Sequence, residues 1–264
     1  MPSMRADQLL VERGLAASRS QAQRLIAAGV RWRPNEEWRG DWRTVAKNGD
    51  ELPVDAALEL LDDAESRYVS RGGLKLEGAL RASGIDVAGK RCLDVGQSTG
   101  GCTDCLLQQG AARVVGIDVG HGQLHERLRT DPRVVCIERV NARQLDAAAL
   151  GEQAKAFDLI VGDVSFISLT LVLPALVPWL ASHGELLMLA KPQFELQPGQ
   201  LGKGGIVRDP ALYREVEQRL RSCCEALGLS VVGWHDSAIL GGDGNHEFFI
   251  HARARTGDEA KRQR

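Results

Sequence analysis

The sequence predicts an α/β protein: a mainly parallel sheet with helices on both faces and an antiparallel strand pair at its edge, preceded by a small α+β domain. Two observations support this. From Arg91 onward, short runs rich in β-branched residues alternate with helical segments. Residues 1–60 instead carry two short amphipathic helices and short strand patterns. We therefore expect a small domain over 1–60, a linker over 61–70, a large domain over 71–254 and a disordered tail over 255–264.

The helices of the small domain are predicted from the spacing of apolar residues. Both segments place apolar residues at i, i+3 and i+4: Ala6, Leu9 and Leu10 in one, and Ala22, Leu25 and Ile26 in the other. Gly14 ends the first helix, Ser18 is a good N-cap for the second, and Gly29 suits its C-terminal end. Residues 48–54, NGDELPV, then predict a turn into the last strand of this domain.

The large domain is predicted strand by strand. Five strands follow in order: RCLDVG, RVVGIDVG, RVVCIERV, FDLIVGDVSF and GELLMLAKP. A helix over Pro210 to Leu227 has Asp209 as its N-cap and Gly228 after its end. The last two strands run from Leu229 to Ile239 and from Glu247 to Ala254. The sequence GGDG at 241–244 joins them, which predicts a hairpin at the edge of the sheet.

Composition excludes several classes of protein. The chain has 264 residues, of which 44% are hydrophobic, and its densest apolar stretch, Leu171 to Leu180, contains two prolines. That stretch is shorter than the roughly 20 residues that span a bilayer. Met1 to Leu15 has no continuous apolar run typical of an export signal, so we expect a cytoplasmic protein with no membrane partner. The six cysteines include a single C-x-x-C, Cys102 and Cys105, which predicts reduced, buried thiols and no metal site.

The net charge of −2 argues against a protein that coats nucleic acid, but the charge is unevenly distributed. Met1 to Arg33 carries six Arg against two acids, whereas residues 34–60 carry three bases against seven acids. Arg5, Arg19 and Arg24 fall on the polar side of the two predicted helices. Exposed arginines on such a pair suit phosphate contacts, and a solvated helix face is an equal alternative.

Aromatic residues near the small domain leave two interpretations open. Trp32, Trp38 and Trp42 can stack on nucleobases, although packing around a small core is the more common use of tryptophan. In the predicted linker, Tyr68 and its neighbouring arginines can touch RNA or form a simple hinge.

The loop after the first strand of the large domain predicts a nucleoside cofactor. It reads LDVGQSTGG and places glycines at 96, 100 and 101, which is not the G-x-G-x-x-G spacing that packs a pyrophosphate. This spacing argues against a nicotinamide-dependent oxidoreductase. A longer glycine loop beside Asp94 suits a ligand with a cation and no phosphate, and S-adenosylmethionine is such a ligand. Asp118 ends the next strand, where it can accept the ribose hydroxyls of a nucleoside or cap a helix.

Two further polar residues end otherwise apolar strands. Asp163 closes the fourth strand and Lys191 closes the fifth. Because the carboxyl ends of neighbouring parallel strands open on one crevice, we expect these two side chains to meet. Their pairing fits a catalytic site or a simple ion pair equally well.

Sequence blocks along the chain resemble known families. Arg5 to Val30 resembles the small RNA-binding domain named after ribosomal protein S-four. Beyond it the chain resembles the FtsJ-like RNA 2′-O-methyltransferases, and most closely the TlyA family, through SRGGLKLEGAL, LDVGQSTGGCTDCLLQQGA, VGIDVG, DLIVGDVSFISL, LAKPQFE, GKGGIVRDP and GNHEFFIH. Family members more often read LDVGASTGGFTD in the second block, so Gln97 and Cys102 depart from the pattern.

This resemblance implies a Rossmann-like class I methyltransferase sheet and a Lys-Asp-Lys-Glu tetrad at Lys75, Asp163, Lys191 and Glu247. The implied activity is methyl transfer from S-adenosylmethionine to a ribose 2′-hydroxyl, usually of a cytidine in large-subunit ribosomal RNA. Lys191 is the candidate base, and the two acids orient both amines. The implied cofactor residues are Asp94, Gly96, Ser98, Thr99, Gly100, Gly101 and Asp118. The expected partner is ribosomal RNA or a ribosomal subunit, contacted through Arg5, Arg19, Arg24 and Arg71.

Two other classes of protein are alternatives to a methyltransferase. Some relatives carry the label haemolysin, so the alternative is a non-enzymatic RNA-binding or haemolysin-type interaction protein. The complete tetrad would then have no purpose. A pseudouridine synthase can also carry an S-four-type domain, but its Arg-Leu-Asp context is absent from the sequence.

Overall fold

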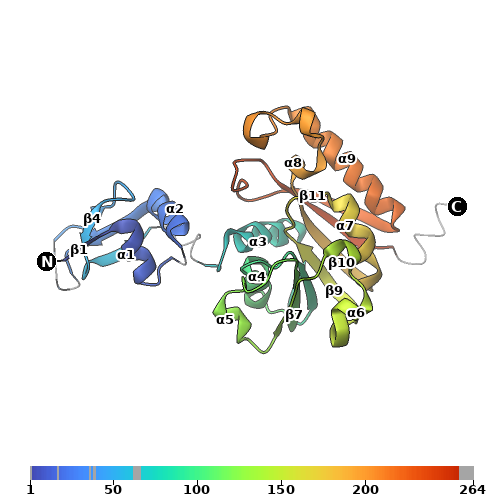
Figure 1. Ribbon diagram of the computed structural model, residues 1–264, viewed down its shortest axis with the longest axis horizontal. Coiled ribbons are helices and arrows are strands. Elements are labelled where there is room, and N and C mark those ends of the chain that lie inside the picture. Colours follow the sequence, from blue (N-terminus) through green and yellow to red (C-terminus); the bar gives the residue numbers. More distant parts are fainter. Residues whose placement is uncertain (1, 17, 36, 38–39, 62–66, 256–264) are drawn as a thin grey trace. The chain divides into compact units, whose positions relative to one another are not determined.

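The structure is a computed structural model that describes residues 2–16, 18–35, 37, 40–61 and 67–255. It divides into two compact units, Met1–Arg71 and Gly72–Arg264 (Figure 1), which are described separately below. The predicted tail after Arg255 and residues 62–66 of the predicted linker lie outside the described residues. Among the described helices, none is both long enough and apolar enough to cross a membrane.

The described residues of the first unit form two helices and five short strands. Its helices are α1, Ala6–Glu12, and α2, Arg19–Gly29. Its strands are β1, Ser3–Arg5; β2, Val30–Arg33; β3, Arg43–Thr44; β4, Glu51–Pro53; and β5, Ala57–Leu60. β1 pairs with β4, and β2 lies between β3 and β5, all antiparallel. Both predicted helices are confirmed, and the Ser18 side chain accepts a hydrogen bond from the backbone N–H of Gln21 at 3.3 Å.

One strand of this unit differs from the prediction. The strand after the turn at 48–50 is β4, which is not the last, because β5 follows it and pairs with β2. The sequence of β5, Ala-Leu-Glu-Leu, has low intrinsic strand preference, so the strand depends on pairing that the local sequence does not reveal.

The described tryptophans of the first unit contact different side chains. Trp32 packs against the core formed by α1, α2 and the strands, which confirms core packing as the interpretation for this residue. The Arg43 guanidinium lies 5.4 Å from the Trp32 ring centroid, and that of Arg33 lies 4.7 Å from the Trp42 ring centroid. Trp38 lies outside the described residues.

The second unit is built on one seven-stranded sheet, in the order β11-β12-β10-β9-β6-β7-β8. The strands are β6, Arg91–Val95; β7, Arg113–Asp118; β8, Val134–Glu138; β9, Phe157–Gly162; β10, Leu180–Ala190; β11, Leu229–Asp236; and β12, Phe248–Ala254. Among the described strands of this sheet, only β12 runs against the common direction, antiparallel to its neighbours β10 and β11. The predicted parallel sheet with an antiparallel pair at its edge is therefore confirmed. β6 is the switch point of the strand order, because its partners β7 and β9 lie on opposite sides of it. The ligand crevice is therefore expected at the carboxyl ends of these strands.

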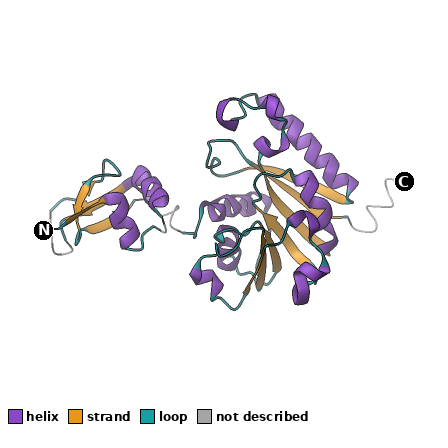
Figure 2. Cartoon of the chain, viewed as in Figure 1, coloured by secondary structure: helices purple, strands orange, loops and turns teal. Residues whose placement is uncertain are grey.

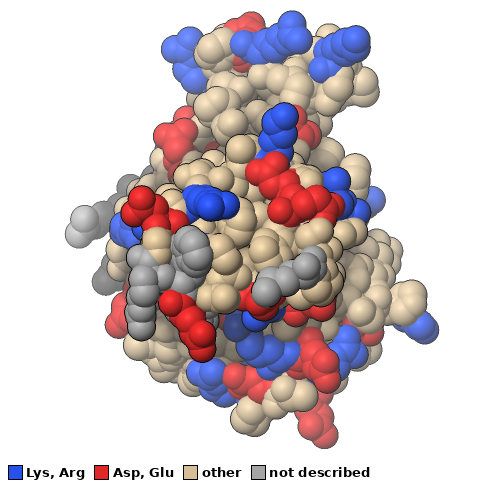
Figure 3. Space-filling model, turned by 90° about the vertical axis from the view of Figure 1, so that its left-hand side faces the viewer, with Lys and Arg blue, Asp and Glu red and all other residues tan. Residues whose placement is uncertain are grey.

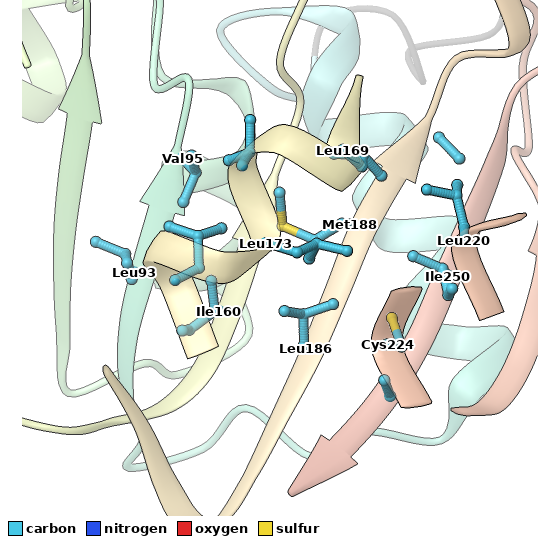
Figure 4. Close-up of a cluster of buried hydrophobic side chains, with 14 of the residues drawn as sticks. Leu93, Val95, Ile160, Leu169, Leu173, Leu186, Met188, Leu220, Cys224 and Ile250 are labelled. Atoms are coloured by element: carbon cyan, nitrogen blue, oxygen red, sulfur yellow. The ribbon is translucent and has the colours of Figure 1, made fainter. Parts of the chain in front are cut away.

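Helices lie on both faces of this sheet (Figures 1 and 2). They are α3, Arg71–Ser83; α4, Gly101–Gln108; α5, Glu126–Arg129; α6, Ala147–Leu150; α7, Leu169–Leu176; α8, Pro192–Glu195; and α9, Pro210–Ala226. Short 3₁₀ turns occupy Ala142–Gln144, Gly151–Gln153, Val177–Trp179, Pro198–Gln200 and Lys203–Gly205. Figure 4 shows α7 and α9 against the sheet, where Leu173, Leu220 and Cys224 pack with Leu186 and Met188.

The helix predicted near the C-terminal end is confirmed as α9. The Asp209 side chain accepts a hydrogen bond from the backbone N–H of Ala211 at 2.9 Å, as an N-cap residue does. Val216 and Leu220 of this helix are fully buried. All six cysteines are free thiols, of which Cys136 and Cys223 are only half-buried. Among the described residues, no three His, Cys, Asp or Glu side chains are grouped to hold a metal ion.

Candidate active site

Asp163 and Lys191 meet at the carboxyl ends of two paired strands. Asp163 follows β9 and Lys191 follows β10, and these strands pair in parallel. The Lys191 Nζ lies 2.5 Å from Asp163 Oδ1 and donates a hydrogen bond to Ser165 Oγ at 2.8 Å. The contact predicted from the two strand ends is therefore confirmed.

Lys75 and Glu247 complete a cluster of four charged side chains. Lys75 comes from α3 and Glu247 immediately precedes β12. The Lys75 ammonium is hydrogen-bonded to Glu247 Oε2 and lies 4.0 Å from Asp163 Oδ2. Only 8% of the Lys75 side chain and 3% of the Glu247 side chain are exposed. The charges thus alternate in the order Lys191, Asp163, Lys75, Glu247, which is more than a simple ion pair.

Burying four ionised groups is costly unless each is paired, so the cluster needs firm supports. Ser237 and Glu247 pair across the hairpin, where the Ser237 N–H donates to the Glu247 carbonyl at 2.9 Å. The nearby Asn245, also buried, accepts from the Val207 N–H at 2.9 Å. An ideal Cβ placed at Gly78 would lie 2.6 Å from the Ala238 Cβ, so a glycine there lets α3 approach the hairpin. These contacts hold the two ends of the Lys75–Glu247 pair.

An exposed aromatic residue beside the cluster was missed by the sequence analysis. Phe166 is 91% exposed and has a left-handed backbone, with φ +64°. Its ring centroid lies 5.1 Å from that of Phe194, and the Lys191 Nζ lies 5.9 Å from the Phe194 centroid. A bulky residue in this backbone region is costly and persists where surrounding structure imposes it. The sequence gives its type and place, but neither its exposure nor its strain.

The glycine loop after β6 adjoins the cluster. An ideal Cβ at Gly96 would lie 2.9 Å from the Asp163 carbonyl oxygen, so only glycine permits this approach. Gly96 and Gly100 have φ of +80° and +98°, and Ser98 is also left-handed at +49°. Gly101 begins α4, and the Thr99 carbonyl accepts from the His125 N–H at 3.1 Å. The predicted loop residues therefore lie together, next to the end of β9.

Asp118 holds the same loop from the end of β7. Its Oδ2 accepts from the Ser98 N–H and its Oδ1 accepts from the Gly120 N–H, each at 2.7 Å. No helix begins directly after Asp118, since the next one, α5, has His125 as its N-cap. The alternative of a helix cap is therefore wrong. Carboxylate oxygens have a second lone pair, so these contacts leave acceptor capacity for hydroxyl groups.

Asp94 lies beneath the loop and is fully buried. Thr103 Oγ1 donates to its Oδ2 at 2.7 Å, and its Oδ1 has no hydrogen-bond partner among the described residues. Burial, and to a lesser degree the nearby charges of Asp163 and Asp118, raise the pKa of Asp94 to about 7. A buried carboxylate with an unused acceptor is well suited to a cationic ligand.

Comparison with known proteins gives the family. Residues 68–254 match the FtsJ-like methyltransferase family, which is most of the chain. The chain belongs to the FtsJ-like methyltransferases. This FtsJ-like chain is 46% identical over 252 residues to the 16S/23S rRNA (cytidine-2′-O)-methyltransferase TlyA of Mycobacterium tuberculosis (strain CDC 1551 / Oshkosh), covering 96% of this chain and 90% of that one.

Several other matches to this FtsJ-like chain carry a haemolysin name. Hemolysin A of Brachyspira hyodysenteriae is 38% identical over 255 residues, covering 94% of this chain and 99% of that one. A solved structure described as a putative hemolysin from Streptococcus thermophilus is 39% identical, with a TM-score of 0.72 and coverage of 96% of this chain and 89% of that one. The haemolysin label therefore accompanies the same fold as the methyltransferase names.

The cofactor of this FtsJ-like methyltransferase is S-adenosylmethionine, and the residues present fit it. The unused acceptor of Asp94 suits a cation, and Asp118 keeps acceptor capacity for hydroxyls. The fit comes from the donor and acceptor chemistry of these residues.

Two of the arginines that are predicted to bind RNA, Arg5 and Arg19, donate hydrogen bonds to a buried carboxylate of the first unit. Asp7 is fully buried and accepts from Arg5 Nε and Nη2 and from Arg19 Nη2, all at 3.0 Å. These arginines lower the pKa of Asp7 well below its usual range. Arg5 and Arg19 remain 41% and 54% exposed. Arg24 is half-buried on α2, and Arg71 is the first residue of α3.

Proposed function

We propose that this FtsJ-like methyltransferase transfers the methyl group of S-adenosylmethionine to the ribose 2′-hydroxyl of a cytidine in ribosomal RNA, in the cytoplasm. The observation that carries the proposal is the buried Lys191–Asp163–Lys75–Glu247 cluster, which adjoins the glycine loop at Gly96. The relative from M. tuberculosis is named for 16S and 23S rRNA, and one from Campylobacter jejuni, 31% identical, is named for 23S rRNA. The 23S RNA common to both names supports the large subunit as the target.

The chemistry explains why such a cluster is needed. A ribose 2′-hydroxyl is a weak nucleophile, so the protein must align it and remove its proton during attack. The Lys191 side chain, after releasing its own proton, accepts the proton of the hydroxyl. The ammonium that forms is then stabilised by Asp163 at 2.5 Å and by Ser165. Bound S-adenosylmethionine supplies the activated methyl group, and Asp94, Gly96 and Asp118 would hold it.

Lys75 and Glu247 hold the Asp163 carboxylate in position next to Lys191. Lys75 lies between the two acids, so Asp163 has a cation on either side. Because Lys75 and Glu247 are almost fully buried, they change position little when RNA binds, and the Asp163 carboxylate is ready before the substrate arrives. Their role in this scheme is to orient, while Lys191 moves the proton.

Side chains of both units are proposed to bind the RNA. Single-stranded RNA is recognised through stacking on aromatic rings, and Phe166 offers such an exposed ring against Phe194, which neighbours Lys191. Arg5, Arg19 and Arg24 are proposed to contact RNA phosphates, with Asp7 fixing the first two. On the face drawn in Figure 3, basic and acidic side chains are interspersed. RNA binding by a few placed arginines is consistent with that mixed charge and with the net charge of −2.

The test is transfer from labelled S-adenosylmethionine to undermethylated ribosomal subunits. Lys191→Ala is expected to lower transfer roughly 100-fold or more, because the proton acceptor is lost. Its affinity for S-adenosylmethionine, measured by calorimetry, should stay within about twofold.

Lys90→Ala is the matched control for this test. Lys90 also forms an ion pair, with Glu185 at 3.2 Å, but it precedes β6, at the opposite end of that strand from the glycine loop. This variant should retain transfer. Near-normal turnover by Lys191→Ala would refute the role of Lys191 as the base.

A further inference from the structure

Gln97, which departs from the family pattern, has a side chain that is turned inward. It sits in the glycine loop, yet only 3% of the residue is exposed. An ideal Cβ at Gly116 on β7 would lie 2.0 Å from the Gln97 side-chain amide carbon. The Gln97 amide therefore occupies space that the absence of a side chain at Gly116 leaves open.

The Gln97 amide begins a short hydrogen-bond relay. Gln97 Nε2 donates to Thr103 Oγ1 at 2.8 Å, and Thr103 Oγ1 donates to Asp94 Oδ2 at 2.7 Å. A hydroxyl has a single hydrogen, and an amide nitrogen can only donate. Because Gln97 donates to the Thr103 oxygen, the Thr103 hydrogen is directed to Asp94. All three residues are buried.

Two acceptor atoms in this relay remain unused. Asp94 Oδ1 and Gln97 Oε1 are buried and have no hydrogen-bond partner among the described residues. Unsatisfied buried acceptors are costly in a folded protein, and they persist where a ligand supplies the missing donor. They lie at the two ends of the relay, which runs from the glycine loop that is proposed to hold the cofactor to Asp94.

We propose that Gln97 is a positioning residue for cofactor binding, which acts through Thr103 to hold Asp94 with Oδ1 available to a cationic group of S-adenosylmethionine. The inference rests on the proposed function, since it takes Asp94 as a cofactor ligand. It goes beyond the family pattern, because alanine is the more common residue at this position and cannot donate. This chain contains all three residues that form the relay.

The relay has a consequence that a packing role would not have. A hydrogen bond to a carboxylate favours its charged form, whereas burial and the charges of Asp163 and Asp118 oppose it. The adjacent Cys102 thiol is neutral, since burial raises its pKa well above the usual value. Without Gln97 the Thr103 hydrogen is free to turn away from Asp94, so a larger fraction of Asp94 is protonated near neutral pH and cannot bind a cation.

The experiment measures the dissociation constant of S-adenosylmethionine by calorimetry at pH 6.5 and 8.5, with the full chain and no RNA. The variants are Gln97→Ala, Gln97→Met, Thr103→Val and the double variant Gln97→Met/Thr103→Val. Gln97→Met keeps the side-chain volume and removes the donor. Gln108→Ala is the control, since it removes a side-chain amide on α4, the helix of Thr103, that bonds to Asp104 at 3.0 Å. Each constant is divided by that of the unaltered chain at the same pH, which cancels titration of the cofactor.

For Gln97→Met we expect a ratio near one at pH 8.5 and about eightfold weaker binding at pH 6.5, as follows when the lost donor raises the pKa of Asp94 by about one. Thr103→Val should show the same pH dependence, and the double variant should bind no more weakly than Thr103→Val alone. Gln108→Ala should match the unaltered chain.

Two results would overturn the relay while leaving the proposed function intact. One is a Gln97→Met ratio that is equal at both pH values. The other is a full additional loss in the double variant, which would mean that Gln97 does not act through Thr103. If the unaltered chain fails to bind S-adenosylmethionine, the proposed function is refuted and this inference with it.

Discussion

Each unit of the molecule contains a fully buried aspartate, and the two have opposite electrostatic environments. Asp7 in the first unit accepts hydrogen bonds from Arg5, Arg19 and Gln23, and its pKa lies well below the usual range. Asp94 in the second unit accepts hydrogen bonds only from the uncharged Thr103 among the described residues, and its pKa is raised to about 7. Both residues are 0% exposed.

The difference separates a structural carboxylate from one that is available to a ligand. Charged donors compensate Asp7 for its lost hydration, so its ionised form stabilises the fold. Asp94 lacks such compensation, and its burial weakens the fold by itself. Residues that weaken a fold and persist are candidates for function, and this agrees with the position of Asp94 beneath the glycine loop.

The largest expected effect concerns Asp94→Asn. Asparagine can still accept from Thr103 but carries no charge, so the affinity for S-adenosylmethionine should fall roughly 30- to 100-fold at pH 8. In the same variant the second unit should become more stable by about 1 kcal/mol, because an uncompensated buried charge is removed. Calorimetry measures the first effect, and amide hydrogen exchange on β6 measures the second.

These two results must occur together if the comparison is correct. A variant that lost affinity and stability in parallel would mean that Asp94 supports the fold as Asp7 does. An unchanged affinity would remove Asp94 from the cofactor site.

The second prediction concerns Asp7→Asn, which should have the opposite consequences. Loss of the charge leaves Arg5 and Arg19 without their shared carboxylate, so the first unit should be destabilised by about 2–3 kcal/mol. S-adenosylmethionine binding should not change, since none of its proposed ligands lies in this unit. Hydrogen exchange on α2 in the full chain measures the loss.

Asp55→Asn provides the control for this prediction, because Asp55 is an exposed aspartate of the same unit. Its substitution should change stability by less than about 0.5 kcal/mol. Equal effects of the two substitutions would show that burial and arginine pairing do not distinguish Asp7.

The sequence predicts the parts of the site that depend on regular structure. Asp163 and Lys191 are placed together by a general property of parallel strands, and the glycine loop is recognisable by its spacing. Lys75 and Glu247 follow only from the family resemblance, because a helix and a hairpin far apart in the chain bring them to the cluster. Local sequence carries no information about such long-range contacts.

One residue and one strand show most clearly what could not be predicted. Gln97 appears in the sequence as a departure from a loop motif, and its inward direction depends on the space beside Gly116 on a different strand. The strand β5 depends in the same way on pairing with β2. In both cases a tertiary contact decides the outcome, and residue type alone does not.

The smallest expected effect is a difference in how the two units respond to pH. The pKa of Asp7 is lowered, so its contribution to stability is present above pH about 4 and is lost only as the pH falls further. The pKa of Asp94 is raised to about 7, so its folded form binds more protons than the unfolded chain between pH about 4 and 7. The second unit should therefore lose stability through Asp94 as the pH rises from 6 to 8, while Asp7 leaves the first unit unchanged.

Other groups titrate in this range, so the contribution of Asp94 must be isolated. Burial lowers the pKa of His251 in the same unit, which favours stability at higher pH and opposes the effect of Asp94. The difference in stability between the unaltered chain and Asp94→Asn cancels His251. This difference should change by about 1 kcal/mol between pH 6 and 8, measured by hydrogen exchange on β6 and corrected for the intrinsic rate at each pH. A difference that stays constant would mean that Asp94 is ionised throughout this range and is compensated as fully as Asp7.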